Sequence, residues 1–294
     1  MAQMESEAVD SAEDLAEARR KLAQGLADAG GGNRAILRLT DEELAVIDPM
    51  TQEGEEGLVP SPHMSRLTAK ERAMAMSTAL RSLVSRGLIE LTNVEELYDL
   101  MRQQEADGSE NDPDVRTPVD IRMTEEAALV LNLRRSAERA LAAELTTSAG
   151  TAYALVYIHS AELFMVERVT TGGLHLFSLT NSSEDAAQLI QALVDPFGIA
   201  DRDGRTQKLD PNALDSDNVG QPLQKVIDNS LVIGRLMVLA DSDGALVLTY
   251  ATDRDLWTVT VDEPNSPKGI LAQAVGAKTL GRKIAGLLKL PEQS

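Results

Sequence analysis

The chain has 294 residues, no cysteine and a formal net charge of −19, which excludes disulfides, thiol catalysis and cysteine-bound zinc. The negative charge opposes binding to nucleic acid or to anionic lipid, and residues 1–120 carry most of it, with 25 acidic and 12 basic side chains. The sequence has neither an apolar signal segment nor a run of about 18 apolar residues, so we expect a cytoplasmic location.

The N-terminal part of the sequence predicts helices separated by polar segments. Residues 1–33 form an acidic extension, helical or disordered, that ends in three consecutive glycines. Residues 34–104 form a helical region with three capping boxes, Thr40 with Glu43, Thr68 with Glu71, and Thr92 with Glu95. A helix should follow each threonine, and the second should end at Gly87 in a left-handed conformation. Residues 105–120 form an acidic linker.

Residues 121–199 predict a first module of helix, three strands and helix. The first helix is expected over residues 124–146. Short β-branched and aromatic runs at residues 152–158, 162–169 and 174–179 predict antiparallel strands, with a hairpin turn at Gly172 and Gly173. Serines before the acidic pair at residues 184 and 185 then begin the closing helix.

The same order of elements recurs in residues 219–290, after a linker at residues 200–218. Here the sequence predicts a helix at residues 221–230, strands at 232–240, 245–251 and 256–261, and a helix at 268–289. We therefore predict an α+β fold of duplicated α-β-β-β-α modules with quasi-two-fold symmetry, following an N-terminal helical part. Each module is expected to have its own three-stranded antiparallel sheet, covered by helices on one face.

No residue cluster in the sequence carries recognisable catalytic chemistry, so no catalytic, metal-binding or cofactor-binding residues are predicted. The segments at residues 201–204 and 241–244 have the D-x-D-G pattern but lack the other ligands of a calcium loop, and tight turns are the favoured interpretation. His63, His159 and His175 show no metal-binding spacing, which favours sheet-surface or half-buried histidines.

The C-terminal helix offers the best candidate surface for a protein partner. Its apolar stripe is interrupted by glycines that permit close approach of another backbone, and it either covers the second sheet or extends to a partner-binding edge. We predict a partner-binding set from this helix and the second module, namely Val232, Leu236, Val238, Trp257, Ile270, Leu280, Ile284 and Leu287.

Several segments resemble the EspG family of cytosolic chaperones that serve actinobacterial type VII (ESX) secretion. They are Leu39-Thr40 with residues 43–47, Leu58-Val59-Pro60, residues 71–72 and 83–88, and residues 250–261 with Asp253, Trp257, Thr258 and Val259. The resemblance covers residues 39–288 and leaves out the extension to Asn33. It implies two quasi-symmetric halves, no catalysis and no cofactor, and binding of helical PE–PPE-type substrates through the central sheet and the C-terminal helical region.

The leading hypothesis is thus a non-enzymatic chaperone or adaptor, monomeric or homodimeric, that keeps a helical secretion substrate soluble, with no nucleic-acid or membrane partner. The alternative is a transcription regulator that uses residues 68–91 as a winged helix, with a C-terminal sensing domain. A third hypothesis is an enzyme, which would need a deep pocket with convergent polar groups.

Overall fold

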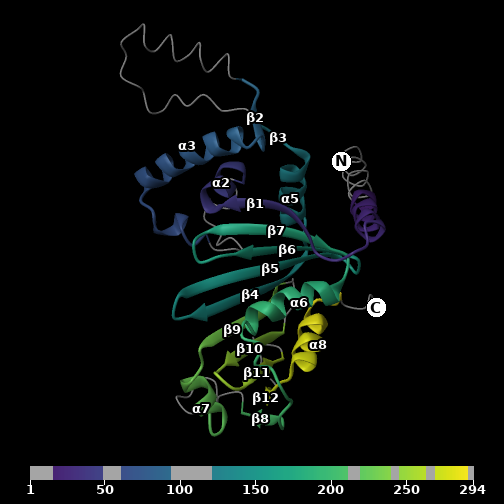
Figure 1. The fold of residues 1–294 in the computed structure, drawn as a ribbon, viewed down its shortest axis with the longest axis vertical. Coiled ribbons are helices and arrows are strands. Elements are labelled where there is room, and N and C mark those ends of the chain that lie inside the picture. The colour runs from purple at the N-terminus through teal and green to yellow at the C-terminus, as the bar shows by residue number, and fades with distance from the viewer. Residues whose placement is uncertain are drawn as a thin grey trace, which may run out of the picture.

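A single ten-stranded antiparallel sheet organises the protein. The computed structural model describes residues 16–48, 61–93, 121–210, 219–239, 245–262 and 269–290. The strand order is β1-β7-β6-β5-β4-β9-β10-β11-β12-β8, and β4 and β9 form the antiparallel pair at its centre (Figure 1). The strands are β1 (Arg34–Thr40), β4 (Arg139–Thr147), β5 (Gly150–Ser160), β6 (Leu163–Val169), β7 (Leu174–Thr180), β8 (Gln207–Leu209), β9 (Val232–Leu239), β10 (Leu246–Ala251), β11 (Leu256–Val261) and β12 (Ile270–Ala274).

Helices lie against both faces of this sheet. Besides a helix at residues 16–28, they are α2 (Asp41–Ile47), the 3-10 turn η2 (Met64–Arg66), α3 (Ala69–Ser85), α5 (Glu125–Arg135), α6 (Ser183–Val194), α7 (Leu223–Asp228) and α8 (Ala277–Leu287). A small hairpin of β2 (Ile89–Leu91) and β3 (Ile121–Met123) stands apart from the main sheet. The chain is therefore an α+β protein, with α5 before β4–β7 and α6, and α7 before β9–β12 and α8.

The expectation of two separate three-stranded sheets is wrong, because β4 and β9 join both halves into one sheet. Each half also has a fourth strand that the sequence interpretation placed in a helix. β4 occupies the end of the helix expected over residues 124–146, which stops at Arg135, and β12 occupies the start of the one expected over 268–289. Both strands are rich in alanine and leucine, whose intrinsic preference is helical, and pairing with neighbouring strands overrides that preference.

The N-terminal capping boxes at Thr40 and Thr68 are confirmed. In each, the threonine hydroxyl accepts a hydrogen bond from the glutamate amide, while the glutamate carboxylate accepts one from the threonine amide. Gly87 has a φ of 65°, as the predicted left-handed helix end requires. The third box, at Thr92, extends outside the described residues. The helix at residues 16–28 buries Ala23 and Leu26 in the core, so this part of the extension is helical and packed.

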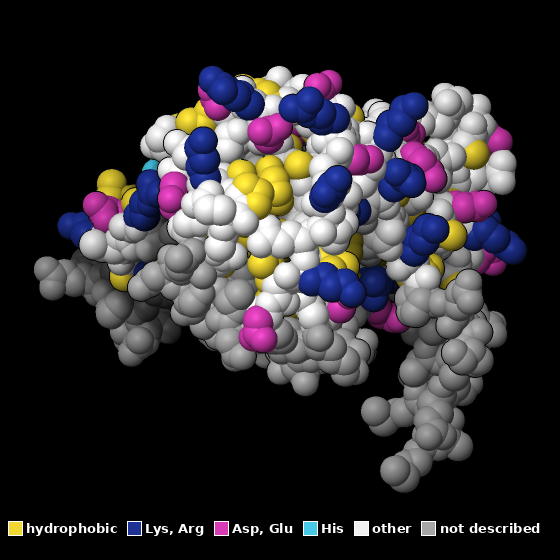
Figure 2. Space-filling view, turned by 90° about the horizontal axis from the view of Figure 1, so that it is seen from below, with side chains coloured by type: hydrophobic (Ala, Val, Ile, Leu, Met, Phe, Trp, Pro, Cys, Tyr) yellow, Lys and Arg dark blue, Asp and Glu magenta, His cyan; other side chains and the backbone are white. Residues whose placement is uncertain are grey.

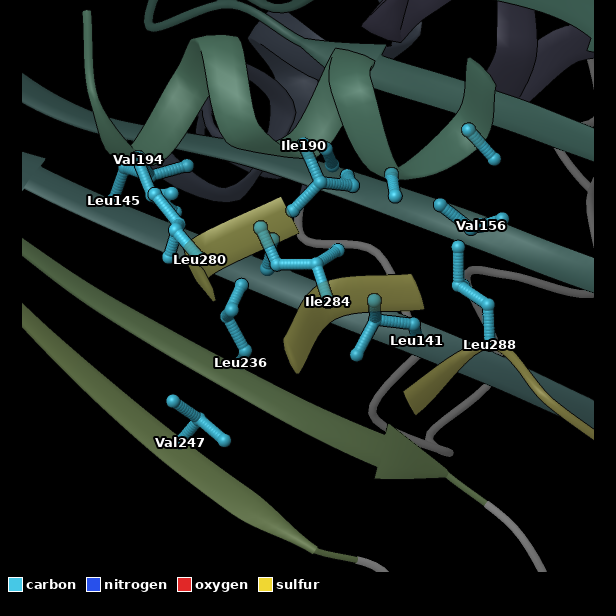
Figure 3. Packing of buried hydrophobic residues seen from close by; sticks show 14 of the residues in the cluster. Leu141, Leu145, Val156, Ile190, Val194, Leu236, Val247, Leu280, Ile284 and Leu288 are labelled. Carbon is cyan, nitrogen blue, oxygen red and sulfur yellow. The ribbon is translucent and has the colours of Figure 1, made fainter. Parts of the chain in front are cut away.

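Three apolar clusters hold the layers together. Under α6 and α8, side chains of both helices meet the inner strands from both halves of the chain, including Leu141 of β4 and Leu236 of β9 (Figure 3). The second cluster lies on the opposite face, between β5–β7 and the layer formed by residues 16–28, α2 and α5. The third lies between α7 and the outer strands β11 and β12. Since the first cluster draws on both halves, neither half completes its core alone.

Helix α8 receives its N-terminal cap from a distant segment. Its N-cap residue is Gly276, which has no side chain to offer, and Asp203 fills that role from the connection after α6. The Asp203 carboxylate accepts hydrogen bonds from the Gly276 amide and the Thr279 hydroxyl, each at 2.8 Å. These two bonds hold the pKa of Asp203 below its usual range. The prediction of a tight turn at residues 201–204 is wrong, because this segment runs beside the start of α8, where Asp203 caps the helix. Its counterpart at 241–244 lies outside the described residues.

We expect Asp203→Ala to loosen the first turn of α8. Without the carboxylate, the Gly276 amide and the Thr279 hydroxyl lose their acceptor. Amide hydrogen exchange at residues 276–280 should become several-fold faster, while exchange in α6 stays unchanged. Equal exchange rates in α8 of the variant and the wild type would contradict this capping function.

Within the described ranges, no helix combines the length and the apolar character that crossing a membrane requires.

Candidate partner-binding surface

The structure places most of the predicted partner-binding residues inside the protein. Six of the eight side chains are buried, at 0–4% exposure, where they pack within the chain's own core. They are Val232, Leu236, Val238, Ile270, Leu280 and Ile284. Only Trp257 of β11 and Leu287 of α8 are half-buried and keep exposed surface. The apolar stripe of α8 thus covers the sheet, and surface for a partner must be sought beside these residues.

Such a surface exists on the sheet face that is turned away from α6 and α8. Because side chains alternate along a strand, residues next to the buried Leu145, Leu236 and Val247 point to this other face. Strand pairing places them in two cross-strand rows, Tyr153–Glu144–Arg235–Leu248 and Thr146–Ile233–Tyr250–Trp257. All eight side chains are half-buried or exposed, and Ile233 is 41% exposed. We call these eight residues the open-face patch.

The open-face patch crosses the seam between the two halves of the chain, since it contains β5 and β4 on one side and β9, β10 and β11 on the other. It contains three aromatic residues, two aliphatic residues and one threonine, together with Glu144 and Arg235, which stand opposite each other in register. Figure 2 views the molecule from the end that carries α7 and β8, where apolar side chains reach the surface between lysines and arginines. Half-exposed aromatic residues of this kind are typical of protein interfaces.

Helical elements border the open-face patch on two sides. On one side, Leu248, Tyr250 and Trp257 pack against the cluster under α7. On the other, Tyr153 packs against the N-terminal layer. Partial burial raises the pKa of Tyr153, and the Glu144 carboxylate adds to this shift while the Arg66 guanidinium opposes it.

A second surface feature is a groove of about 590 Å³ between α6 and α8. Small side chains of both helices line its floor, and a Cβ added at Gly281 would lie 2.9 Å from the Gln191 amide oxygen. The glycine-thinned face of α8 thus lies close to α6, as the sequence interpretation expected of a glycine-bearing helix. Lys278 and Arg282 line the groove on the α8 side.

A buried network of charged side chains connects the N-terminal layer to the sheet. The His175 ring lies between two carboxylates, with Nε2 at 2.7 Å from Asp41 Oδ1 and Nδ1 at 2.6 Å from Glu167 Oε1. Glu167 Oε2 also accepts hydrogen bonds from the Tyr157 hydroxyl at 2.6 Å and from Arg134 Nε at 3.1 Å. Arg134 continues the network to Asp48 at the end of α2, which Arg135 contacts as well.

The interpretation of His175 as a sheet-surface or half-buried histidine is wrong, because the side chains of His175, Asp41 and Glu167 are all 0% exposed. Burial lowers the pKa of His175, but hydrogen bonds to Asp41 and Glu167 outweigh it, so the pKa lies above its usual value. Burial likewise opposes ionisation of Glu167, yet Arg134, His175 and Tyr157 hold its pKa below the usual range. Both shifts favour an imidazolium between two carboxylates.

The other two histidines lie outside this network, and both ring nitrogens of His159 are buried without a hydrogen-bond partner among the described residues. His159, near the end of β5, is half-buried, and burial together with the Arg19 charge lowers its pKa to about 4. His63 is about half exposed, with its ring 3.1 Å from Glu42. Among the residues that the structure describes, no group of histidine, aspartate and glutamate side chains is arranged to hold a metal ion.

Sequence reasoning missed the open-face patch and the buried network for the same reason. Both combine residues far apart in the chain, such as positions 41 and 175, that only strand pairing and helix packing bring together. A signal was available for the patch, since Ile233, Arg235 and Met237 alternate with buried residues along one predicted strand. Neither a scan against models of known protein families nor a search of curated proteins found a match to this chain.

Proposed function

We propose that this protein is a non-enzymatic cytoplasmic chaperone or adaptor that binds a helical segment of a type VII secretion substrate of the PE–PPE kind. The partner class follows from the resemblance of residues 39–288 to the EspG family. The single observation that carries the binding site is the open-face patch, a half-exposed apolar surface at the centre of the sheet. The α6–α8 groove offers a second contact region beside the C-terminal helix.

The proposal includes duplication of one module, now with four strands in place of three. Residues 125–194 and 223–287 share the order of helix, four strands and helix. The antiparallel β4–β9 pair lies where a two-fold axis normal to the sheet would pass. Superposing the Cα atoms of the two segments tests this idea, and a failure of the strands to overlay in order would overturn it.

A chaperone function also fits the placement of charge. The concentration of titratable groups around His175 is sealed from solvent, so a substrate molecule could not reach these atoms. The open-face patch instead offers aromatic and aliphatic area around one pair of opposite charges. Such a surface suits the apolar face of an amphipathic helix, with Glu144 and Arg235 available to polar groups at its margin.

We expect Ile233→Asp to weaken substrate binding by about tenfold or more, which corresponds to about 1.4 kcal/mol. The substitution puts a charge into the middle of the open-face patch, where a bound helix would desolvate it. The measurement is affinity for a co-purified helical secretion substrate, and the thermal midpoint of the free protein should fall only slightly because Ile233 is 41% exposed.

The matched control is Met74→Asp on α3, which adds the same charge at a position that is 65% exposed and outside the patch. This variant should bind like the wild type. Equal losses in both variants would show a general effect of charge and count against the patch. Failure of the wild type to co-purify with any helical secretion substrate would overturn the proposed function.

The winged-helix alternative gains one observation, since α3 is followed by the hairpin β2–β3. The cationic side chains of this region argue against DNA binding. Arg86 donates to Glu43 at 2.6 Å and to the Arg38 carbonyl at 2.7 Å, so its guanidinium is engaged within the protein. A recognition helix needs several cations free to contact phosphates. A DNA-binding assay at low salt discriminates the two functions.

A further inference from the structure

We propose that the groove between α6 and α8 is a docking surface for an acidic amphipathic helix of a partner protein. The groove and the open-face patch lie on opposite faces of the sheet, because the patch side chains alternate with those buried under α6 and α8. The inference gives the second contact region of the proposed function a ligand of its own, and it does not depend on the open-face patch. With both surfaces, the protein can hold two partners at once.

The floor of the groove is apolar and consists of small residues. Ala187 of α6 and Ala277, Gly281 and Ala285 of α8 line a volume of about 590 Å³. The distance between packed helices depends on the side chains at the contact, so a floor of small residues suits a third helix that packs along the groove. Since α6 has 12 residues and α8 has 11, the groove matches a helix of about three turns.

Two cations on the α8 side of the groove have no opposite charge in contact. Lys278 and Arg282 are exposed, and neither forms an ion pair with a carboxylate among the described residues. Arg282 donates to neutral acceptors, the Thr279 hydroxyl at 3.0 Å and the Lys278 carbonyl at 3.4 Å. Residues 269–290 contain four cations and no carboxylate. The α8 side of the groove is therefore a local positive surface on an acidic chain.

The one carboxylate that lines the groove lies away from these cations. It belongs to Glu184, at the start of α6, where the hydroxyls of Ser182 and Ser183 donate to it. Gln191, two helical turns or about 10 Å further along α6, is the residue that lies against Gly281, next to Arg282. The acidic end of α6 thus leaves the charges of Lys278 and Arg282 available to a ligand.

The positions of the two cations are unfavourable for the free protein. Lys278 lies in the first turn of α8, where the helix dipole disfavours a positive charge. Arg282 follows four residues later, and like charges at this spacing on a helix repel each other. Residues that depart from local preferences without a compensating contact in the chain are typical of functional sites. The missing compensation is a negative charge that a ligand can supply.

An acidic helix supplies that charge in register. Carboxylates four residues apart on a helix have the same spacing as Lys278 and Arg282, about 6 Å along the axis, so two ion pairs can form side by side. Alanine or leucine side chains on the adjoining face of the ligand would then cover the apolar floor. On the other margin, the amide groups of Gln188 and Gln191 can bind polar side chains. The ligand is therefore a helix with an apolar face and carboxylates along one margin.

The experiment measures binding of a designed peptide to the full chain. The peptide is helical, has about 15 residues, and carries alanine and leucine on one face and glutamates four residues apart along its margin. The net charge of −19 repels such a peptide, so binding requires a local positive site. We expect Lys278→Glu to weaken binding by about tenfold or more, and replacement of the peptide glutamates by glutamine to do the same. A carbodiimide should crosslink a peptide glutamate to the Lys278 amine.

Lys225→Glu is the matched control, because it reverses the same charge at an exposed helical position on α7, on the opposite face of the sheet. This variant should bind the peptide like the wild type. The thermal midpoint of Lys278→Glu should not fall, since the new glutamate lies in the first turn of α8 and four residues before Arg282. A loss of binding in this variant is then not a loss of folding.

Equal affinity of the wild type and Lys278→Glu for the peptide would overturn the proposal, as would an equal loss in Lys225→Glu. A crosslink between Lys278 and residues 1–15 in the free chain would also overturn it. That segment has five acidic and no basic side chains, so the crosslink would assign the groove to the chain itself and not to a partner. None of these outcomes bears on the open-face patch, whose test uses Ile233→Asp and a secretion substrate.

Discussion

Replacing Glu167 by glutamine should destabilise the protein by about 3–5 kcal/mol, the cost typical of removing one partner from a buried ion pair. Glu167 is 0% exposed and accepts from His175, Tyr157 and Arg134, so the change affects three buried donors together. Glutamine keeps the shape but offers one neutral oxygen and an NH₂ group that opposes the other donors. The measurement is the free energy of unfolding from urea titration at neutral pH.

Glu162→Gln provides the control, because it makes the same chemical change at an exposed position immediately before β6. Surface substitutions of this kind usually change stability by less than about 0.5 kcal/mol. The difference between the two variants isolates the cost of the buried network. A loss below about 1 kcal/mol for Glu167→Gln would show that the network tolerates a neutral partner, contrary to the effect expected when a buried ion pair loses one carboxylate.

The second large effect is expected from Gly234→Ala in β9, at about 1–3 kcal/mol of destabilisation from overpacking. A Cβ at this position would overlap the Thr249 hydroxyl oxygen of the paired strand, and Val194 of α6 lies 3.5 Å away on the same side. Thr249 is 1% exposed and sits in the middle of β10, so it has little freedom to move. Unfolding in urea gives the loss directly.

A double-mutant cycle identifies the cause. The Thr249 hydroxyl is buried and has no hydrogen-bond partner among the described residues, so Thr249→Ala alone should change stability little. Combined with Gly234→Ala, it removes the overlapping atom and should recover most of the loss. Additive losses in the double mutant would exclude steric overlap with Thr249.

Gly286 of α8 provides a control glycine, because a Cβ added there would have no atom within 4 Å. Gly286→Ala should therefore stabilise the protein by up to about 1 kcal/mol.

The sequence predicted local features well where short-range physics decides them. The capping boxes at Thr40 and Thr68 depend on residues three positions apart, and both formed. Strands β5, β6, β7, β9, β10 and β11 were predicted from alternation and β-branched composition. The hairpin turn before β7 required a glycine, and Gly173 has a φ of 74° there.

Features decided by long-range pairing were not predictable in the same way. β1 was not recognised as a strand, and its place beside β7 depends on residues about 140 positions apart in the chain. β4 and β12 have helix-favouring compositions, so only their sheet neighbours reveal them as strands. The sequence left two options for the apolar stripe of α8, contact with the second sheet or with a partner, because helical spacing does not identify the surface that covers a stripe. The structure buries Leu280 and Ile284 of this stripe in the core.

The outer strands of the sheet have a consequence for self-association. β1 and β8 end the sheet on its two sides, and both come from segments outside the helix–four strands–helix units, β1 from the N-terminal region and β8 from the connection between the halves. β8 is three residues long and carries Lys208, while β1 carries Arg34 and Arg38 and contains a register irregularity. Edge strands that are short, charged or irregular offer few backbone groups for hydrogen bonding to a strand of another copy. They therefore protect the concentrated protein from polymerising through its sheet edges.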